Sequence, residues 1–230
     1  MWFPYELVSR QAIEQPARRR NLVIELGKQG VDEGHGGSVR AESTNARYAI
    51  TMDANGGSHG DEVRLSDGAL VAIRPIRPDD EPLMAAFHAG LSMRSVYQRY
   101  FHLSSLEQRI THSRLSLTCR VDPAAGLAIV ADHVTAKGAH EVLALGRLTR
   151  TEPGAAEIAL LVMDRWQGRG LGRAMMHALV AQARALGVRR LHGDMLADND
   201  AMRAVVRRAG FSVQPVPGDA AVLRAERVVD

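Results

Sequence analysis

A glycine-rich turn between a strand-like run and a long amphipathic segment constrains this chain more than any other feature. The run at 157–163 reads EIALLVM, and the turn at 167–173 reads QGRGLGR. Glycine lets a backbone turn tightly and leaves no Cβ to hold a ligand away. Several N–H groups can then point into one concavity at the start of a helix, where the helix dipole favours negative charge. The turn therefore predicts a phosphate site.

The spacing of the glycines excludes two common phosphate-binding motifs. A dinucleotide fingerprint needs a third glycine three positions after Gly170, where this chain has Arg173. A Walker A loop ends in Gly-Lys-Ser or Gly-Lys-Thr, and no such pair follows. The remaining pattern is Q-x-x-G-x-G, formed by Gln167, Gly170 and Gly172. By itself this pattern leaves open that the glycines serve only close packing of a strand against a helix.

The segments that follow the turn add further signals. A second strand-like run at 190–196 is followed by Asn199 and by another helical stretch, for which Gly210 is the expected C-terminal stop. The order strand, Q-x-x-G-x-G, helix, strand, Asn, helix, Gly-Phe resembles the acetyl-CoA-binding half of the GNAT superfamily of N-acetyltransferases. The resemblance covers residues 157–211.

The resemblance extends upstream of the turn. Residues 73–80, IRPIRPDD, read as a strand that ends at proline, followed by acidic residues suited to a helix N-terminus. Residues 91–101, LSMRSVYQRYF, resemble the L-S-x-x-S-V-Y-x-R-[FY]-F signature of one GNAT branch. That branch includes the acetyltransferase domains of bacterial Pat-type protein lysine acetyltransferases. A methionine three residues after the helix-start asparagine, here Met202 after Asn199, also resembles that branch.

The order of predicted elements indicates the fold class. Antiparallel strands come early, at 70–76, 127–131 and 142–146, and helices alternate with strands later, which predicts a mixed, mostly antiparallel α/β sheet flanked by helices. Helices are expected at 81–88, 92–101 and 106–117. Residues 1–60 show no sustained periodicity, so we expect a poorly ordered extension there and a GNAT domain at 61–230.

Composition excludes several classes of protein. The net charge of +3 is small and the arginines are scattered, so no nucleic-acid partner is expected. Cys119 is the single cysteine, and the nine histidines show no ligand spacing, so no metal is expected. No apolar stretch approaches the roughly 20 residues that span a bilayer, and the N-terminus lacks a signal-like core. A cytoplasmic protein is the expectation.

The resemblance implies acetyl-CoA as co-substrate. Its pyrophosphate would bind the N–H groups of the turn, and the backbone of the preceding strand would pair with the pantetheine arm. The side chain of Asn199 would lie near the arm, although it could equally cap the following helix. Arg169 and Arg173 could add charge or simply be solvated. The expected donor-binding residues are Leu161, Val162, Met163, Gln167, Gly168, Arg169, Gly170, Leu171, Gly172, Arg173 and Asn199.

Acetyl transfer to an amine also needs a base, because a lysine with a pKa of ~10.4 is almost wholly protonated at neutral pH. Glu157 is the candidate: it precedes six apolar residues, and the Pat-type domains that the chain resembles carry a catalytic Glu at this place. A solvated carboxylate at the start of a strand is the alternative.

Two other residues bear on the expected mechanism. Many GNAT enzymes carry a proton-donating Tyr where this chain has Val206, so the acid that protonates the thiolate is unassigned. Cys119 lies among apolar residues, which favours a buried inert thiol over an acyl-enzyme nucleophile.

Three functions fit the sequence. The first is an N-acetyltransferase that acts directly on a protein lysine. The second keeps the fold and uses a small amine or a protein N-terminus as acceptor. The third is a non-catalytic acyl-CoA sensor, for which a base such as Glu157 would have no use.

Overall fold

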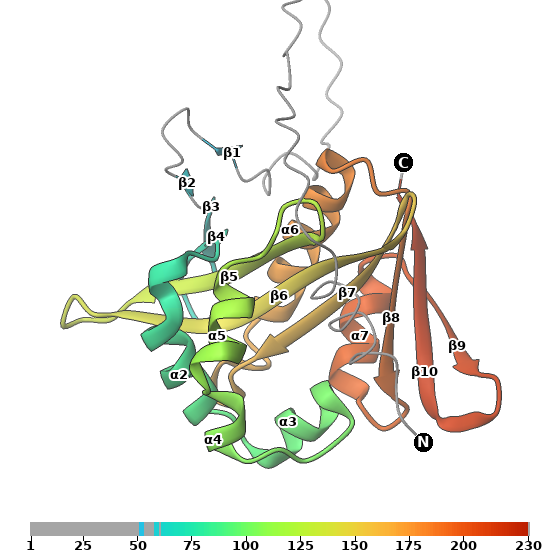
Figure 1. The fold of residues 1–230 in the computed structure, drawn as a ribbon, viewed down its shortest axis with the longest axis horizontal. Helices are drawn as coiled ribbons and strands as arrows, with labels where there is room; N and C mark the ends of the chain where they lie inside the picture. The colour runs from blue at the N-terminus through green and yellow to red at the C-terminus, as the bar shows by residue number, and fades with distance from the viewer. Residues whose placement is uncertain (1–50, 53–57, 60, 230) are drawn as a thin grey trace, which may run out of the picture. The chain divides into compact units, whose positions relative to one another are not determined.

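The computed structural model describes residues 51–52, 58–59 and 61–229. The expected extension at 1–60 therefore lies outside the described residues, apart from β1 (Thr51–Met52) and β2 (Ser58–His59), which pair with each other. The remaining described strands form one eight-stranded sheet in the order β3-β4-β5-β6-β7-β8-β10-β9 (Figure 1). Only the β7–β8 pair is parallel. The predicted mixed, mostly antiparallel sheet is confirmed.

The elements follow the sequence pattern closely. The strands of the large sheet are β3 (Asp61–Arg64), β4 (Leu70–Pro75), β5 (Gly126–Val134), β6 (His140–Glu152), β7 (Ala155–Val162), β8 (Arg190–Leu196), β9 (Ser212–Val216) and β10 (Asp219–Val228). The helices are α2 (Glu81–Ala89), α3 (Met93–Tyr100), α4 (Leu106–Arg109), α5 (His112–Cys119), α6 (Leu171–Ala185) and α7 (Asp200–Arg208), with short 3₁₀ turns η2 (Pro78–Asp80) and η3 (Asp164–Trp166).

The expected single helix at 106–117 is wrong, because the chain forms two short helices there. Ile110 ends α4, and Thr111 has an extended ψ of 139° before α5 begins. Threonine suits the position that precedes a helix better than its interior, because its branched side chain loses rotamer freedom inside a helix. The break lets α5 pack against α2 as an element of its own.

The sheet is buried on both faces by helices. One face packs against α6 and α7, and the other packs against α2, α3 and α5. In β7, Ile158 and Leu160 belong to the α6 side, whereas Leu161 and the following Met163 belong to the α2 side. Because both faces of this central strand are covered, its sequence is nearly continuously apolar, as strands covered on both faces usually are.

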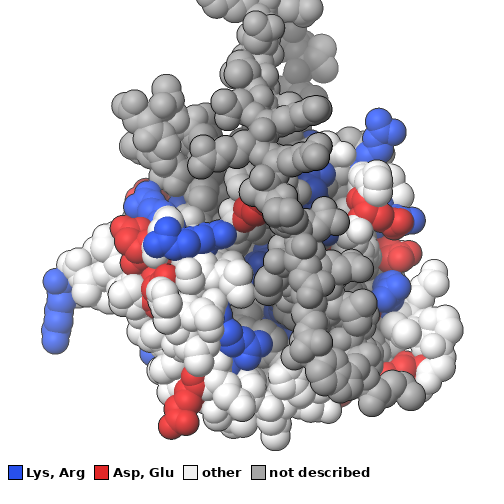
Figure 2. Space-filling view, in the orientation of Figure 1, with Lys and Arg blue, Asp and Glu red and all other residues white. Residues whose placement is uncertain are grey.

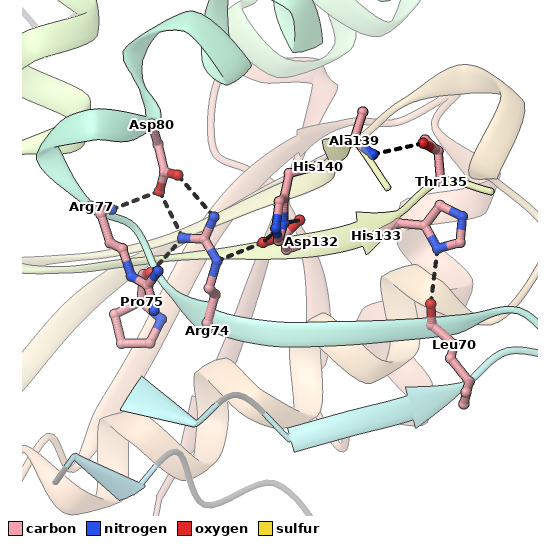
Figure 3. A network of polar contacts seen from close by, with 10 residues as sticks. All are labelled: Leu70, Arg74, Pro75, Arg77, Asp80, Asp132, His133, Thr135, Ala139 and His140. Atoms are coloured by element: carbon pink, nitrogen blue, oxygen red, sulfur yellow. Dashed lines mark hydrogen bonds and ion pairs between the residues drawn. The ribbon is translucent and has the colours of Figure 1, made fainter. Parts of the chain in front are cut away.

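A buried ionic network fixes the edge of the sheet where α2 begins (Figure 3). The guanidinium of Arg74 on β4 is 6% exposed and donates through both Nη atoms to Asp80, at 2.7 and 2.8 Å. Its Nε donates to Asp132 on β5 at 2.9 Å. His140 on β6 places Nδ1 3.0 Å from both oxygens of Asp132. Arg74 and Asp132 together thus join η2, β4, β5 and β6.

His88 on α2 gives the fold a pH dependence. Burial, with smaller contributions from the charges of Arg109 and Arg114, lowers the pKa of His88 from 6.5 to about 4. Because the pKa of His88 is lower in the folded state than in the unfolded state, the contribution of neutral His88 to folding stability is complete above pH 6.5. This contribution is lost as pH falls toward 4. We expect the free energy of unfolding to fall by about 3 kcal/mol over this range on account of His88.

The variant His88→Leu isolates this contribution. In urea unfolding, the free energy of unfolding of the variant should decline less between neutral and mildly acidic pH than that of the unmodified chain. The reason is that the variant has no buried imidazole at position 88 to protonate. Equal pH dependence in the variant and the unmodified chain would contradict the assignment to His88.

Candidate active site

The parallel strands β7 and β8 separate partway along their length. They pair only at Ala155–Arg190, Ala156–Leu191 and Glu157–His192, and Figure 1 shows them fanning apart beyond that point. At Gly193 an added Cβ would lie 2.7 Å from the carbonyl oxygen of Ile158, so only glycine fits where the separation begins. From there on, the β8-facing backbone of β7 lacks a strand partner among the described residues.

The ladder between β6 and β7 decides which backbone groups face that unpaired edge. The N–H of Met163 donates to the carbonyl of Leu143 at 2.9 Å. Backbone groups alternate along a strand, so the N–H of Leu161 also points to β6, whereas those of Leu160 and Val162 point the other way. Of the three residues expected to pair with the pantetheine arm, only Val162 presents its N–H to the open edge. Leu160 is an additional candidate that the sequence reading missed.

The glycines of the turn lie in two different backbone conformations. Gly168 and Gly170 adopt φ of +74° and +90°, a left-handed conformation that other residues rarely adopt. Gly170 precedes α6, and no side chain caps that helix, so its first N–H groups remain available to a ligand. Gly172 instead lies within α6, where an added Cβ would sit 3.5 Å from a methyl group of Val205. Such a contact is an ordinary van der Waals distance, so the packing of α6 on α7 does not itself require glycine at position 172.

The two arginines of the turn have different environments. Nη1 of Arg169 lies 2.7 Å from an oxygen of Asp67, and its guanidinium stacks 4.8 Å above the ring of Trp166. The carbonyl of Arg169 also accepts hydrogen bonds from the N–H and hydroxyl of Ser66, at 3.2 and 3.1 Å. Arg173 is exposed on the first turn of α6. Arg169 thus holds the turn to the β3–β4 connection, and Arg173 is the better placed of the two to meet a phosphate.

The LSMRSVYQRYF segment connects α3 to the glycine turn. Ser92 caps α3, and its N–H and hydroxyl donate to the carboxylate of Asp164 at 2.8 and 2.5 Å. Ser95 donates to the same carboxylate at 2.9 Å and accepts from Nε2 of Gln167 at 3.2 Å. The same Nε2 donates to the carbonyl of Val162 at 2.9 Å. The two serines of the signature therefore fix the start of the turn and the end of β7.

The carboxylate at the centre of this connection is held ionised. Burial by itself would raise the pKa of Asp164, but the hydrogen bonds from Ser92 and Ser95 outweigh burial and keep that pKa below its usual value. An ionised acceptor makes these hydrogen bonds stronger than neutral ones. The connection between α3 and the turn is therefore a charged one.

Glu157 lies at the last paired position of β7, beside the point of separation. It is half-buried and stands opposite Thr149 of β6 and His192 of β8. Arg224 of β10 lies close enough that the charge of Glu157 helps raise its pKa, after the larger contribution of its hydrogen bond to Asp194. The candidate base thus belongs to a row of polar residues that crosses β6, β7 and β8.

Three other residues that the sequence brought into the argument, Asn199, Val206 and Cys119, are all buried. Asn199 caps α7, with its side-chain oxygen accepting from the N–H of Met202 at 3.1 Å, so the expected cap is confirmed. Val206 is buried in the core. Cys119 is buried, and burial followed by the charges of Asp80 and Glu81 raises the pKa of its thiol to about 11. A thiol in this state is a poor nucleophile, because the thiolate is the reactive form.

Charges of both signs are mixed on the described part of one face of the protein. Figure 2 shows Lys and Arg side chains interspersed with Asp and Glu on the described part of the face drawn. Within residues 61–229 and the two short strands before them, no three His, Cys, Asp or Glu side chains cluster as metal ligands would. In the same part of the chain, no helix has the length and apolar character needed to cross a membrane.

Comparison with known proteins identifies the class to which this fold and site belong. Residues 71–212 match the acetyltransferase (GNAT) domain family. The chain therefore belongs to the GNAT acetyltransferases, which are N-acyltransferase enzymes.

Particular relatives narrow the similarity. The chain is 32% identical to the acetyltransferase Pat of Mycolicibacterium smegmatis over 154 residues, which span 64% of this chain and 43% of that protein. It is 30% identical to an acetyltransferase of Pseudomonas aeruginosa over 176 residues, which span 76% of this chain and 92% of that protein. The GNAT domain of S. lividans PAT superposes with a TM-score of 0.64 at 29% identity, covering 74% of this chain and 96% of that domain. The chain thus spans less than half of the length of the mycobacterial relative. The structural similarity to S. lividans PAT is to its GNAT domain.

Proposed function

We propose that this chain transfers an acetyl group directly from acetyl-CoA to an amine, and that the acceptor is a protein lysine side chain. One observation carries the proposal: the carboxylate of Glu157 stands where β7 and β8 separate, and the other end of the same strand leads into the glycine turn before α6. This arrangement supports the proposal that a base and a phosphate site share one backbone edge.

The chain offers complementary groups to each part of the donor. The uncapped N–H groups at 171–173 and the dipole of α6 suit a pyrophosphate. The N–H groups of Leu160 and Val162 suit the amide carbonyls of a pantetheine arm that adds to β7 as an extra strand. Asn199 is already engaged as a cap, which leaves its amide N–H₂ group to donate to the arm.

The proposed reaction needs one base and one oxyanion donor. Glu157 removes a proton from the acceptor ammonium, and the resulting amine attacks the thioester carbonyl carbon. The carbonyl oxygen becomes an oxyanion, which an N–H on the open edge of β7 stabilises. The C–S bond then breaks and the nitrogen loses a second proton to solvent, which leaves the neutral amide. The departing thiolate, with a pKa near 8.5 for an ordinary thiol, takes its proton from solvent. This removes the need for a Tyr at the position of Val206.

The similarity to Pat-type proteins supports a lysine acceptor. The acetyltransferase Pat of Mycolicibacterium smegmatis and the GNAT domain of S. lividans PAT share 32% and 29% identity with the chain. A test is incubation of the chain with isotope-labelled acetyl-CoA, first with a cell lysate and then with a panel of small amines and peptides. Label on lysine Nζ is the expected result. Label found only on small amines or on protein N-termini would show that the acceptor is of that class and not a lysine side chain. Binding of acetyl-CoA without any transfer would indicate a sensor.

The two turn arginines give a prediction about donor binding. Arg173→Ala should weaken acetyl-CoA binding about five- to tenfold, and the loss should shrink at high salt because it removes a screened charge interaction. Arg169→Ala should lower thermal stability, since its side chain holds the β3–β4 connection. Calorimetric titration at two salt concentrations, with thermal unfolding of both variants, checks the contrast. A larger salt-dependent loss in Arg169→Ala would contradict it.

A further inference from the structure

A histidine stands beside the candidate base in a row that crosses three strands. His192 of β8 is in register with Glu157 of β7 on one side and with Glu226 of β10 on the other. Side chains that are directly opposite on neighbouring strands project from the same face, with Cβ atoms about 5 Å apart. His192 is therefore flanked in the sheet by Glu157, the proposed base, and by Glu226.

An irregularity in β6 orients that imidazole. The register between β6 and β7 shifts between Arg150 and Glu152, so Thr151 is the extra residue of a β-bulge. The hydroxyl oxygen of Thr151 lies 3.2 Å from Nε2 of His192. When Nε2–H donates to this oxygen, Nδ1 of the neutral ring is left as an acceptor. In this tautomer the bulge holds one ring nitrogen, and the other is left for proton transfer.

The surroundings of His192 connect Glu157 with solvent. The ring is half-buried, and Asp194, Arg224 and Glu226 next to it are exposed. Asp194 and Arg224 neutralise each other through two hydrogen bonds of 2.8 Å. The groups that face the ring are therefore Thr151 from β6, Glu157 from β7, and the charged side chains of β8 and β10.

We propose that His192 is a proton-relay residue that acts through Glu157. The inference rests on the proposed acetyltransferase function. The acceptor N–H bond breaks as an O–H bond forms on Glu157. That O–H bond then breaks as an N–H bond forms at Nδ1 of His192, directly or through one water. The imidazolium gives its proton to solvent, so both side chains return to their starting states without any redox change.

The first test is His192→Gln in the full chain. We expect kcat near pH 7 to fall about tenfold, less than the loss of the base itself, with the KM values for acetyl-CoA and acceptor unchanged. Free imidazole in the buffer should restore much of the lost rate. His192→Asn, which is smaller and also retains an N–H donor for Thr151, serves as a second variant. The matched control is His140→Gln, which should leave kcat unaltered because His140 lies in the Arg74 network.

Further results separate this proposal from the proposed function. In Glu157→Gln, adding His192→Gln should cause no further loss, because the relay passes through the carboxylate. An unaltered kcat in both His192 variants, or a loss that imidazole does not restore, would overturn the relay while leaving the acetyltransferase intact. Absence of acetyl transfer by the unmodified chain overturns the proposed function, and with it the relay, before any variant is compared.

Discussion

Glu157→Gln is expected to lower kcat/KM for acetyl transfer by about 10²–10⁴-fold while the Kd for acetyl-CoA stays the same. Glutamine matches glutamate in shape but cannot accept the proton of the acceptor ammonium. The half-buried side chain lies at the end of the β7–β8 pairing and away from the glycine turn, so the donor site is not disturbed. Steady-state transfer assays together with calorimetric titration of acetyl-CoA measure the two quantities separately.

The control for this variant is Glu152→Gln. Glu152 lies at the exposed end of β6, where it pairs with Arg190, and it should tolerate the same change without loss of rate. If turnover of Glu157→Gln at saturating substrates equals that of the unmodified chain, Glu157 is only a solvated carboxylate at a strand start.

The second large effect concerns stability. Arg74→Met should lower the free energy of unfolding by about 3–5 kcal/mol, because it leaves two buried carboxylates without their counterion. Asp80 and Asp132 are 4% and 6% exposed, so water cannot replace the guanidinium. Urea unfolding near pH 7 measures the loss. His140→Gln, at the exposed end of the same network, should cost much less, and equal losses in the two variants would contradict the central role of Arg74.

The pH dependence of the Arg74 variant follows from Asp80. Burial would raise the pKa of Asp80, but hydrogen bonds from Arg74 and from the N–H of Arg77 outweigh burial and keep that pKa below 3.8. A depressed folded-state pKa gives stability that is present above the unfolded pKa and is lost as pH falls through the folded value. Without Arg74, burial dominates and the pKa rises. The difference in the free energy of unfolding between Arg74→Met and the unmodified chain should therefore be smaller at mildly acidic pH than at pH 7.

The sequence predicted the strand, glycine turn and helix at 157–185 well because three local signals agree there. The apolar run is long, the left-handed positions carry glycine, and α6 has a strong helical periodicity. The weaker stretch at 106–117 was predicted wrongly because its two helices are too short for periodicity to show the break at Thr111.

The parts of the candidate site that the sequence did not reveal depend on contacts between distant segments. Arg169 pairs with Asp67, 102 residues away, so its local sequence says nothing of its partner. Likewise, the period of two along β7 is visible in sequence, but β6 decides which N–H groups face the open edge. As a result, the N–H groups of Val162 and Leu160 face the open edge, and that of Met163 faces β6. The bulge that brings Thr151 to His192 is another such contact.

The most direct test of the account is to follow a labelled acetyl group from acetyl-CoA to a lysine-containing protein acceptor by mass spectrometry. Direct transfer predicts label on lysine Nζ, one free CoA thiol for each acetyl group transferred, no labelled form of the enzyme, and loss of the reaction in Glu157→Gln. Acetyl-CoA that binds without turnover, or label that accumulates on Cys119 before reaching any amine, would contradict it.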